Sequence, residues 1–148
     1  MAKHRVRRQL NKARSELDRF PSALTRLIAR IAIAAVFYQT GMAKLANWAV
    51  TIELFAGDYR VPLLPSHVAA VLGTTTELAG AAALVLGLGT RVAAGVLLAL
   101  VLVIQVFVYP ENWSDHLVWG TMLAYIATRG PGTISLDHLI VRYWLDRE

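Results

Sequence analysis

Long apolar stretches with very few charges dominate this chain. Between Val61 and Thr90 the only formal charge is Glu77, and no charged residue lies between Val92 and Pro110. A helix that crosses a membrane needs roughly 20 predominantly apolar residues, so both stretches are long enough to span a bilayer. The pattern therefore predicts an all-α integral membrane protein rather than a soluble domain.

The same pattern predicts four membrane-spanning helices that form a bundle. We expect the spans at residues 24–44, 66–88, 92–109 and 116–128. All five prolines fall outside these ranges, as expected for a residue that breaks helical hydrogen bonding. The chain then divides into a cytoplasmic basic segment, a four-helix transmembrane domain and a cytoplasmic C-terminal tail, at residues 1–23, 24–128 and 129–148.

Two further helices are expected at the membrane surface. Residues 48–56, after the first span, have the length and composition of a short interfacial helix. In residues 1–23, apolar side chains recur at spacings of four and three while the opposite face is basic. This pattern predicts an amphipathic helix on an anionic membrane surface. The alternative for this segment is a disordered basic tail that only sets the orientation of the protein.

The distribution of lysine and arginine sets the expected orientation. With the N-terminus inside, thirteen of the fifteen lysines and arginines lie in inner segments, and only Lys44 and Arg60 lie in outer ones. Arg30 and Arg91 lie at the inner surface, where we expect their side chains to extend toward water as anchors. The chain is thus predicted to be a multi-pass protein of a bacterial inner membrane with both termini in the cytoplasm.

Composition narrows the functional classes. Hydrophobic residues make up 56% of the chain, and the net charge of +5 is concentrated before the first span. This placement argues for a membrane surface rather than nucleic acid as the partner of the basic residues. The chain has no cysteine, which excludes thiol catalysis, cysteine-ligated zinc and iron–sulfur clusters. Its histidines are scattered without a ligand spacing, so no metal or haem site is predicted.

Glu77 is the most informative residue because it lies near the middle of the second span. An ionised carboxylate there costs several kcal/mol unless it is paired or protonated. Gly73, Gly80 and Gly87 repeat every seven residues and share a helix face with Glu77. Small residues let helices pack closely, so Glu77 should point into the bundle rather than toward lipid.

Polar residues from the other three spans are expected to meet Glu77 in the outer half of the bundle. Lys44 ends the first span, Gln105 lies in the outer third of the third span, and His116 opens the fourth. Two interpretations are open. The cluster is either a ligand or proton site that opens outward, or it contains a Lys44–Glu77 ion pair that only sets the helix register.

Several short motifs resemble the DoxX family of small bacterial membrane proteins. The resemblance covers residues 23–142 and rests on these pieces in order: Arg30, Gly41–Leu45, Thr76–Leu78, Leu84–Arg91, Val108–Pro110, His116–Trp119 and Gly130–Asp137. It implies a four-helix membrane fold. It also implies a redox-linked role, because members of the family are membrane subunits linked to quinone-dependent thiosulfate oxidation or partners in oxidative-stress complexes.

This resemblance implies that the outer-half cluster binds a quinone or a small sulfur species. Glu77 and His116 would then be the catalytic residues that carry protons. The ligand-binding residues would be Tyr38, Lys44, Gln105 and Trp119. No feature of the sequence carries electrons, so the chain is not expected to be catalytic alone. Other proteins of a redox complex are implied as partners, and a homo-oligomer is left open.

The competing hypothesis is a non-catalytic membrane anchor or assembly factor. The basic N-terminal helix and the C-terminal tail, with Tyr143 and Trp144, would then dock soluble proteins, and the Lys44–Glu77 pair would be structural. A small transporter is a weaker third hypothesis, because four spans could enclose a pore only as an oligomer and no discontinuous helix is evident.

Overall fold

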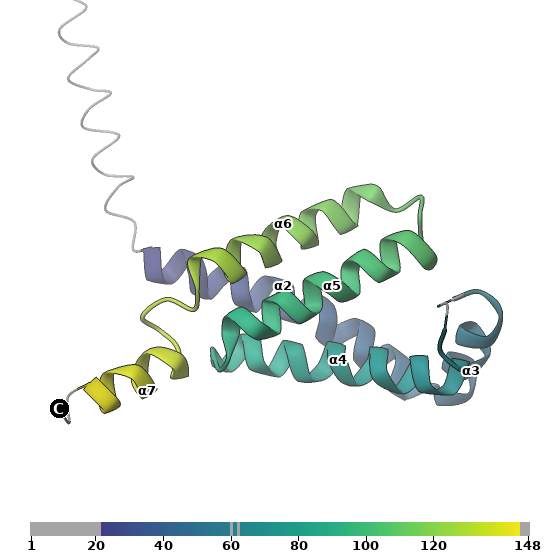
Figure 1. Cartoon of the computed structure of the whole chain (residues 1–148), viewed down its shortest axis with the longest axis horizontal. Helices are drawn as coiled ribbons and strands as arrows, with labels where there is room; N and C mark the ends of the chain where they lie inside the picture. Colours follow the sequence, from purple (N-terminus) through teal and green to yellow (C-terminus); the bar gives the residue numbers. More distant parts are fainter. Residues whose placement is uncertain (1–21, 60, 62, 146–148) are drawn as a thin grey trace, which may run out of the picture.

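The computed structural model describes residues 22–145 except 60 and 62. The expected N-terminal amphipathic helix, at residues 1–23, lies outside the described residues apart from its last two positions. The described residues form helices and no strand (Figure 1). The helices are α2 (Ser22–Ala46), α3 (Trp48–Gly57), α4 (Ser66–Leu86), α5 (Thr90–Phe107), α6 (Trp113–Arg129) and α7 (Leu136–Leu145).

Four of these helices close a ring. Helix α2 contacts α4, α4 contacts α5, α5 contacts α6, and α6 contacts α2. By length and apolar composition, α2, α4 and α5 can each cross a membrane. Helix α6 has 17 residues and runs alongside α5 (Figure 1). The described chain is therefore an all-helical membrane protein, and each expected span falls on one of these four helices.

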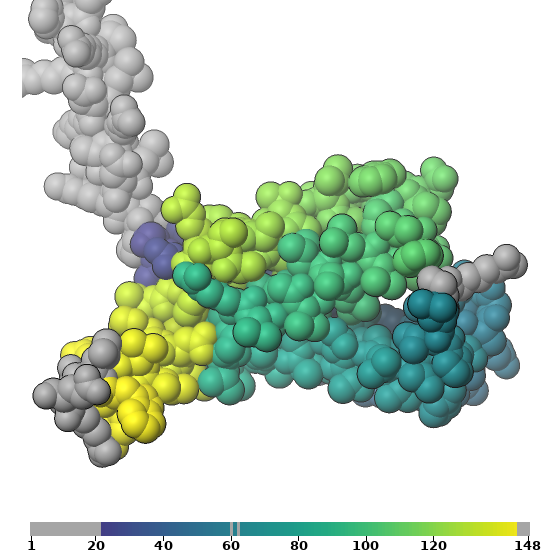
Figure 2. Space-filling model, in the orientation of Figure 1, coloured from purple at the N-terminus to yellow at the C-terminus, as the bar shows by residue number. Residues whose placement is uncertain are grey.

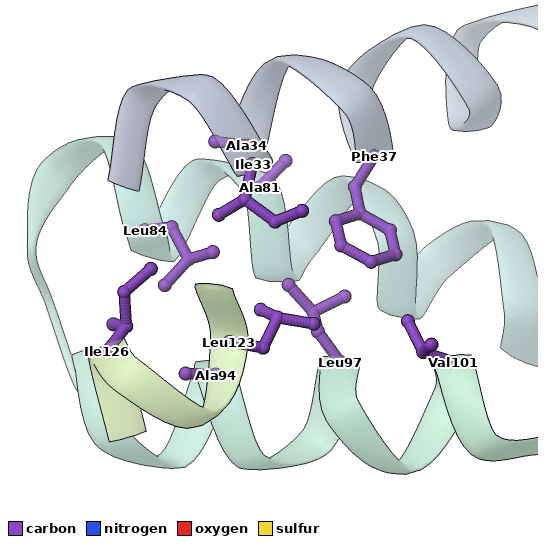
Figure 3. Packing of buried hydrophobic residues seen from close by; sticks show 10 residues of the cluster. All are labelled: Ile33, Ala34, Phe37, Ala81, Leu84, Ala94, Leu97, Val101, Leu123 and Ile126. Carbon is purple, nitrogen blue, oxygen red and sulfur yellow. The ribbon is translucent and has the colours of Figure 1, made fainter. Parts of the chain in front are cut away.

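The centre of the ring is an apolar core to which all four helices contribute (Figure 3). The largest apolar side chains buried there are Ile33, Phe37, Leu84, Leu97, Leu123 and Ile126. Many apolar side chains on the outer faces of the same helices stay exposed, among them Val92, Leu102 and Val106. A bundle that is apolar inside and outside is the arrangement expected for helices surrounded by lipid.

Glycines allow the helices to approach closely. A Cβ atom on Gly41 would lie 2.7 Å from Leu78, and one on Gly80 would lie 2.7 Å from Leu97. The first approach joins α2 to α4, and the second joins α4 to α5. Lipid is as apolar as a leucine side chain, so close packing of this kind is what stabilises helix pairs in a membrane.

The segment after α6 folds back against the turn between α4 and α5. The backbone N–H of Asp137 donates to the carbonyl of Gly87 at 2.9 Å. A guanidinium N–H of Arg30 donates to the carbonyl of Ile134 at 2.5 Å. Arg30 is only 1% exposed, so the expectation that its side chain extends to the membrane surface is wrong. The acceptor that holds it inside comes from a residue 104 positions away in sequence. Arg91, by contrast, is exposed beside Gly130, and its anchoring role stays a prediction.

Asp137 caps α5 from the far end of the chain. Its carboxylate accepts hydrogen bonds from the backbone N–H groups of Gly89, at 2.7 Å, and Thr90, at 2.9 Å. Gly89 itself has no side chain with which to cap the helix. Helix α7 is thereby held beside the α4–α5 turn, at the end of the bundle opposite α3 (Figures 1 and 2). This helix was not predicted, because the tail was treated as a single segment.

The ionisation of Asp137 reflects these contacts. Partial burial raises the pKa of the carboxyl group, but the hydrogen bonds from Thr90 and Gly89 and the attraction of Arg30 lower it by more. The net pKa of Asp137 is therefore below its usual value. A lowered pKa in the folded state means that the carboxylate stabilises the protein above about pH 4, its unfolded pKa. That stabilisation is lost as the pH falls through the folded pKa.

We expect Asp137→Ala to lower the free energy of unfolding by about 1–2 kcal/mol at neutral pH, the usual loss for a helix N-cap. The measurement is chemical unfolding in mild detergent micelles, followed by circular dichroism. The difference from the wild type should narrow as the pH falls below about 4, because the wild-type carboxylate of Asp137 is then progressively protonated and loses its capping interaction. The control is Glu111→Ala, which removes an exposed carboxylate from the α5–α6 loop. Equal losses in the two variants would contradict the capping role.

Candidate functional site

Lys44 and Glu77 form an ion pair between α2 and α4. The ammonium group of Lys44 lies 2.7 Å from each carboxylate oxygen of Glu77. The Glu77 side chain is 3% exposed and that of Lys44 is 21% exposed. Gly41, one turn before Lys44 on α2, allows this approach, since a Cβ atom added at Gly41 would lie only 3.5 Å from the Cβ atom of Glu77. Glu77 thus points into the bundle, as its position among the glycines indicated.

The end of α2 is tied to α3 beside this pair. The hydroxyl group of Thr51 on α3 donates to the backbone carbonyl of Lys44 at 2.9 Å. Asn47 caps the start of α3 by accepting from the backbone N–H of Val50. These contacts turn α3 back so that it packs against α4 as well as α2. The short helix expected at residues 48–56 therefore helps to enclose the polar pair.

Two cavities share the ion pair in their walls. The larger one, here the tyrosine cavity, has a volume of about 260 Å³ and lies among α3, α4 and α5. The smaller one, here the histidine cavity, has a volume of about 130 Å³ and lies among α2, α5 and α6. The residues that line both are Lys44, Glu77, Ile104 and Tyr109. The Lys44–Glu77 pair is therefore in contact with both spaces.

The tyrosine cavity has apolar walls and a pair of hydroxyl groups. Phe55, Leu72 and Leu100 are among its apolar lining residues. The hydroxyl oxygens of Tyr59 and Tyr109 lie 2.6 Å apart. Burial raises the pKa of Tyr59, and the hydrogen bond with Tyr109 raises it further. Tyr59 therefore stays protonated near neutral pH. One hydroxyl group of the pair donates to the other, which leaves one O–H free to donate elsewhere.

The histidine cavity is lined by His116, whose ring is held by Gln105. The Nδ1 atom of His116 lies 2.6 Å from the side-chain oxygen of Gln105. The amide nitrogen of Gln105 donates to the carbonyl of Pro110 at 2.7 Å. Trp119 packs beside His116, with their ring centroids 5.3 Å apart. Gln105 itself is not among the residues that line the tyrosine or histidine cavity.

The structure brings together most of the residues predicted for the site. Lys44 and Glu77 line both cavities, and His116 and Trp119 line the histidine cavity. Gln105 lines neither of these two cavities, and its side chain bonds to His116 instead. Tyr38 is separate from the site, because it is 56% exposed and faces an apolar groove between α2 and α4. Their proposed roles in catalysis or ligand binding stay predictions.

Sequence reasoning missed the tyrosine pair. Tyr59 follows α3 and Tyr109 follows α5, so each stands just beyond the end of a helix. A tyrosine in that position is commonly an interfacial anchor, and nothing in the pattern links residues fifty positions apart. Within the described ranges, no group of three or more His, Cys, Asp or Glu side chains is placed to hold a metal ion.

The DoxX family model matches residues 25–110. That match covers more than half of the chain. The chain belongs to the DoxX family. No curated protein and no solved structure matches it.

The residues matched by the DoxX family model include all the lining residues of the tyrosine cavity and some of those of the histidine cavity. It includes Lys44 and Glu77 and both tyrosines, so the whole lining of the tyrosine cavity lies inside it. The match ends at residue 110, before His116 and Trp119. The tyrosine cavity is therefore the part of the site that belongs most directly to the DoxX region of the chain.

The stability role of the ion pair can be measured by removing one partner and then both. Lys44→Met leaves a buried carboxylate unpaired, and we expect it to destabilise the protein by about 3–5 kcal/mol. The double variant Lys44→Met with Glu77→Met removes both charges at similar volume and should recover most of this loss. Thermal unfolding in detergent, followed by tryptophan fluorescence, measures both. A double variant as unstable as the single one would attribute the loss to packing of the lysine stem instead.

Proposed function

We propose that this chain is a subunit of a redox-linked membrane complex and binds a quinone head group in the tyrosine cavity. DoxX proteins are associated with redox-related membrane functions. The observation that carries the proposal is an apolar cavity whose wall contains two sets of hydrogen-bonding groups, the Lys44–Glu77 pair and the Tyr59–Tyr109 pair. An apolar pocket with a few convergent polar groups is the usual form of a small-molecule site.

The size and chemistry of the cavity suit a quinone. Its volume of about 260 Å³ is just below the usual range of roughly 300–1,000 Å³ for ligand pockets, which favours a one-ring or two-ring head group over a haem or a flavin. A quinone presents two carbonyl groups on a flat apolar ring. Lys44 uses two of its three N–H groups on Glu77, so the third can donate to one carbonyl. The free tyrosine O–H can donate to the other.

The arrangement also offers a route for protons. Reduction of a quinone to a quinol consumes two electrons and two protons. The electrons would come from a partner oxidoreductase, and Glu77 would pass protons to the reduced ring, because it borders both cavities. The histidine cavity, at about 130 Å³, has room for about four water molecules at roughly 30 Å³ each. His116 would supply protons to Glu77 through that water.

The topology that we propose places this site in the outer half of a bacterial inner membrane. Helix α6 would be the fourth span, since it lies in the ring beside three helices that are long enough to cross. The positive-inside rule then places both termini in the cytoplasm. In that orientation, the α4–α5 turn with Arg91 is at the inner surface, and Lys44 and α3 are near the outer one.

A second candidate function, a membrane anchor or assembly factor, is favoured by α7. This helix is held at the end of the bundle by Asp137, and most of its apolar side chains are exposed. Leu139, Ile140 and Val141 are exposed, and Trp144 is 70% exposed. Such a helix offers a surface on which a soluble protein could dock. In this case the Lys44–Glu77 pair would only set the register of α2 against α4.

Quinone content is the first test. The protein is purified in a mild detergent, and the eluate is analysed by mass spectrometry for quinones and for partner proteins. We expect stoichiometric quinone in the wild type and about tenfold weaker retention in Tyr109→Phe, since one lost hydrogen bond is worth roughly that factor. The control is Tyr38→Phe, which removes a hydroxyl group away from both cavities. Partner proteins with no quinone would support the anchor function instead.

The proton route predicts a different phenotype for Glu77→Gln. This variant keeps the volume of the side chain and one oxygen that can accept from Lys44, but it cannot carry a proton. We expect normal expression and normal quinone retention, together with loss of quinone reduction by the complex in isolated membranes. Full activity of the variant would contradict the route, and a failure to accumulate in the membrane would show that Glu77 is needed for folding instead.

A further inference from the structure

The hydrogen bonds of Gln105 determine which nitrogen of His116 carries a proton. The carbonyl of Pro110 can only accept, so the side-chain atom of Gln105 that lies 2.7 Å from it must be the amide nitrogen. The side-chain oxygen of Gln105 then faces His116. An amide oxygen can only accept, so the Nδ1 atom of His116, at 2.6 Å, must be the donor.

We infer that Gln105 is a positioning residue that holds neutral His116 in the tautomer with its proton on Nδ1. The Nε2 atom is then unprotonated, and it is the ring nitrogen that can accept a hydrogen bond or a proton. Both side chains are buried, and their two atoms are in direct hydrogen-bond contact. The opposite amide orientation would place two carbonyl oxygens against each other at 2.7 Å.

The other polar groups of the histidine cavity leave Nε2 available. The residues that contribute them are Thr40, Lys44, Glu77, Tyr109 and Asn112. Lys44 and Glu77 are bound to each other, the Tyr109 hydroxyl contacts Tyr59, and the Thr40 hydroxyl donates to the carbonyl of Phe37. Asn112 is exposed, and its side chain makes no hydrogen bond to His116. In the described structure, His116 makes no hydrogen bond through Nε2. His116 lines this cavity, and its ring is oriented by Gln105 so that Nε2 is the unprotonated nitrogen.

Gln105 was predicted to bind the ligand directly, and that role stays a prediction. In the structure its two hydrogen bonds connect the α5–α6 loop to the ring of His116. The tautomer follows from the hydrogen-bond geometry alone. Only the suggestion that Nε2 takes part in proton transfer rests on the proposed function. A quinone-free protein in detergent is therefore sufficient to examine it.

The test is side-chain nitrogen NMR of the 15N-labelled full-length chain in micelles, at about pH 8 where histidine is neutral. The His116 signal is assigned by its loss in His116→Asn. We expect the wild type to show protonated Nδ1 and unprotonated Nε2. Gln105→Leu removes the acceptor and should reduce the preference for this tautomer by roughly tenfold, the worth of one hydrogen bond.

Gln105→Glu is the matched control. A carboxylate also accepts from Nδ1 but cannot donate to Pro110, so this variant should keep the Nδ1-protonated form. A wild type protonated on Nε2, or a Gln105→Leu variant with the same tautomer preference as the wild type, would overturn the assignment. Because no quinone is present, either result would leave the proposal for the tyrosine cavity unaffected. Conversely, a protein that retains no quinone can still show the expected tautomer.

Discussion

A carboxylate in the middle of a membrane-spanning helix must be paired or neutral, and Glu77 meets this constraint through Lys44. The pair joins the end of α2 to the centre of α4, where Gly41 allows the two helices to approach. Once Lys44 is held there, Thr51 can bond to its backbone carbonyl and α3 is turned back over α4. The tyrosine cavity exists because α3 is in that position. The ion pair and the attachment of α3 thus meet at the same residue, Lys44.

At the opposite end of the bundle, two charged side chains bond to backbone groups rather than to each other. Arg30 is buried among α2, the α4–α5 turn and the segment after α6, and it donates to the carbonyl of Ile134. Asp137 caps α5 and keeps α7 beside the same turn. The Asp137 carboxylate satisfies N–H groups that would otherwise be unpaired at the start of α5, and Arg30 satisfies a carbonyl of the loop before α7. The two ends of the molecule therefore use buried charge for different purposes, one beside two cavities and the other to hold the C-terminal helix in place.

The site illustrates how neighbouring polar groups acquire separate roles. Glu77, Lys44 and the tyrosine pair surround an apolar space, whereas Gln105 and His116 form a linear network that ends at the carbonyl of Pro110. The Lys44–Glu77 pair is compatible with both interpretations that the sequence left open, since it is a close, bidentate pair and also borders two cavities. The cavities are what favour a ligand site.

The amino-acid sequence by itself determined the class of the protein, the positions of the helices in the ring, and the inward direction of Glu77. These features depend on local composition and on the helical repeat, which act over a few residues. Only the tertiary structure decided that Arg30 is buried, that α7 is held by Asp137, that Tyr38 lies away from the site and that Tyr59 meets Tyr109. Each of these depends on contacts between residues far apart in the chain, and hydrophobic periodicity carries no information about which distant groups will meet.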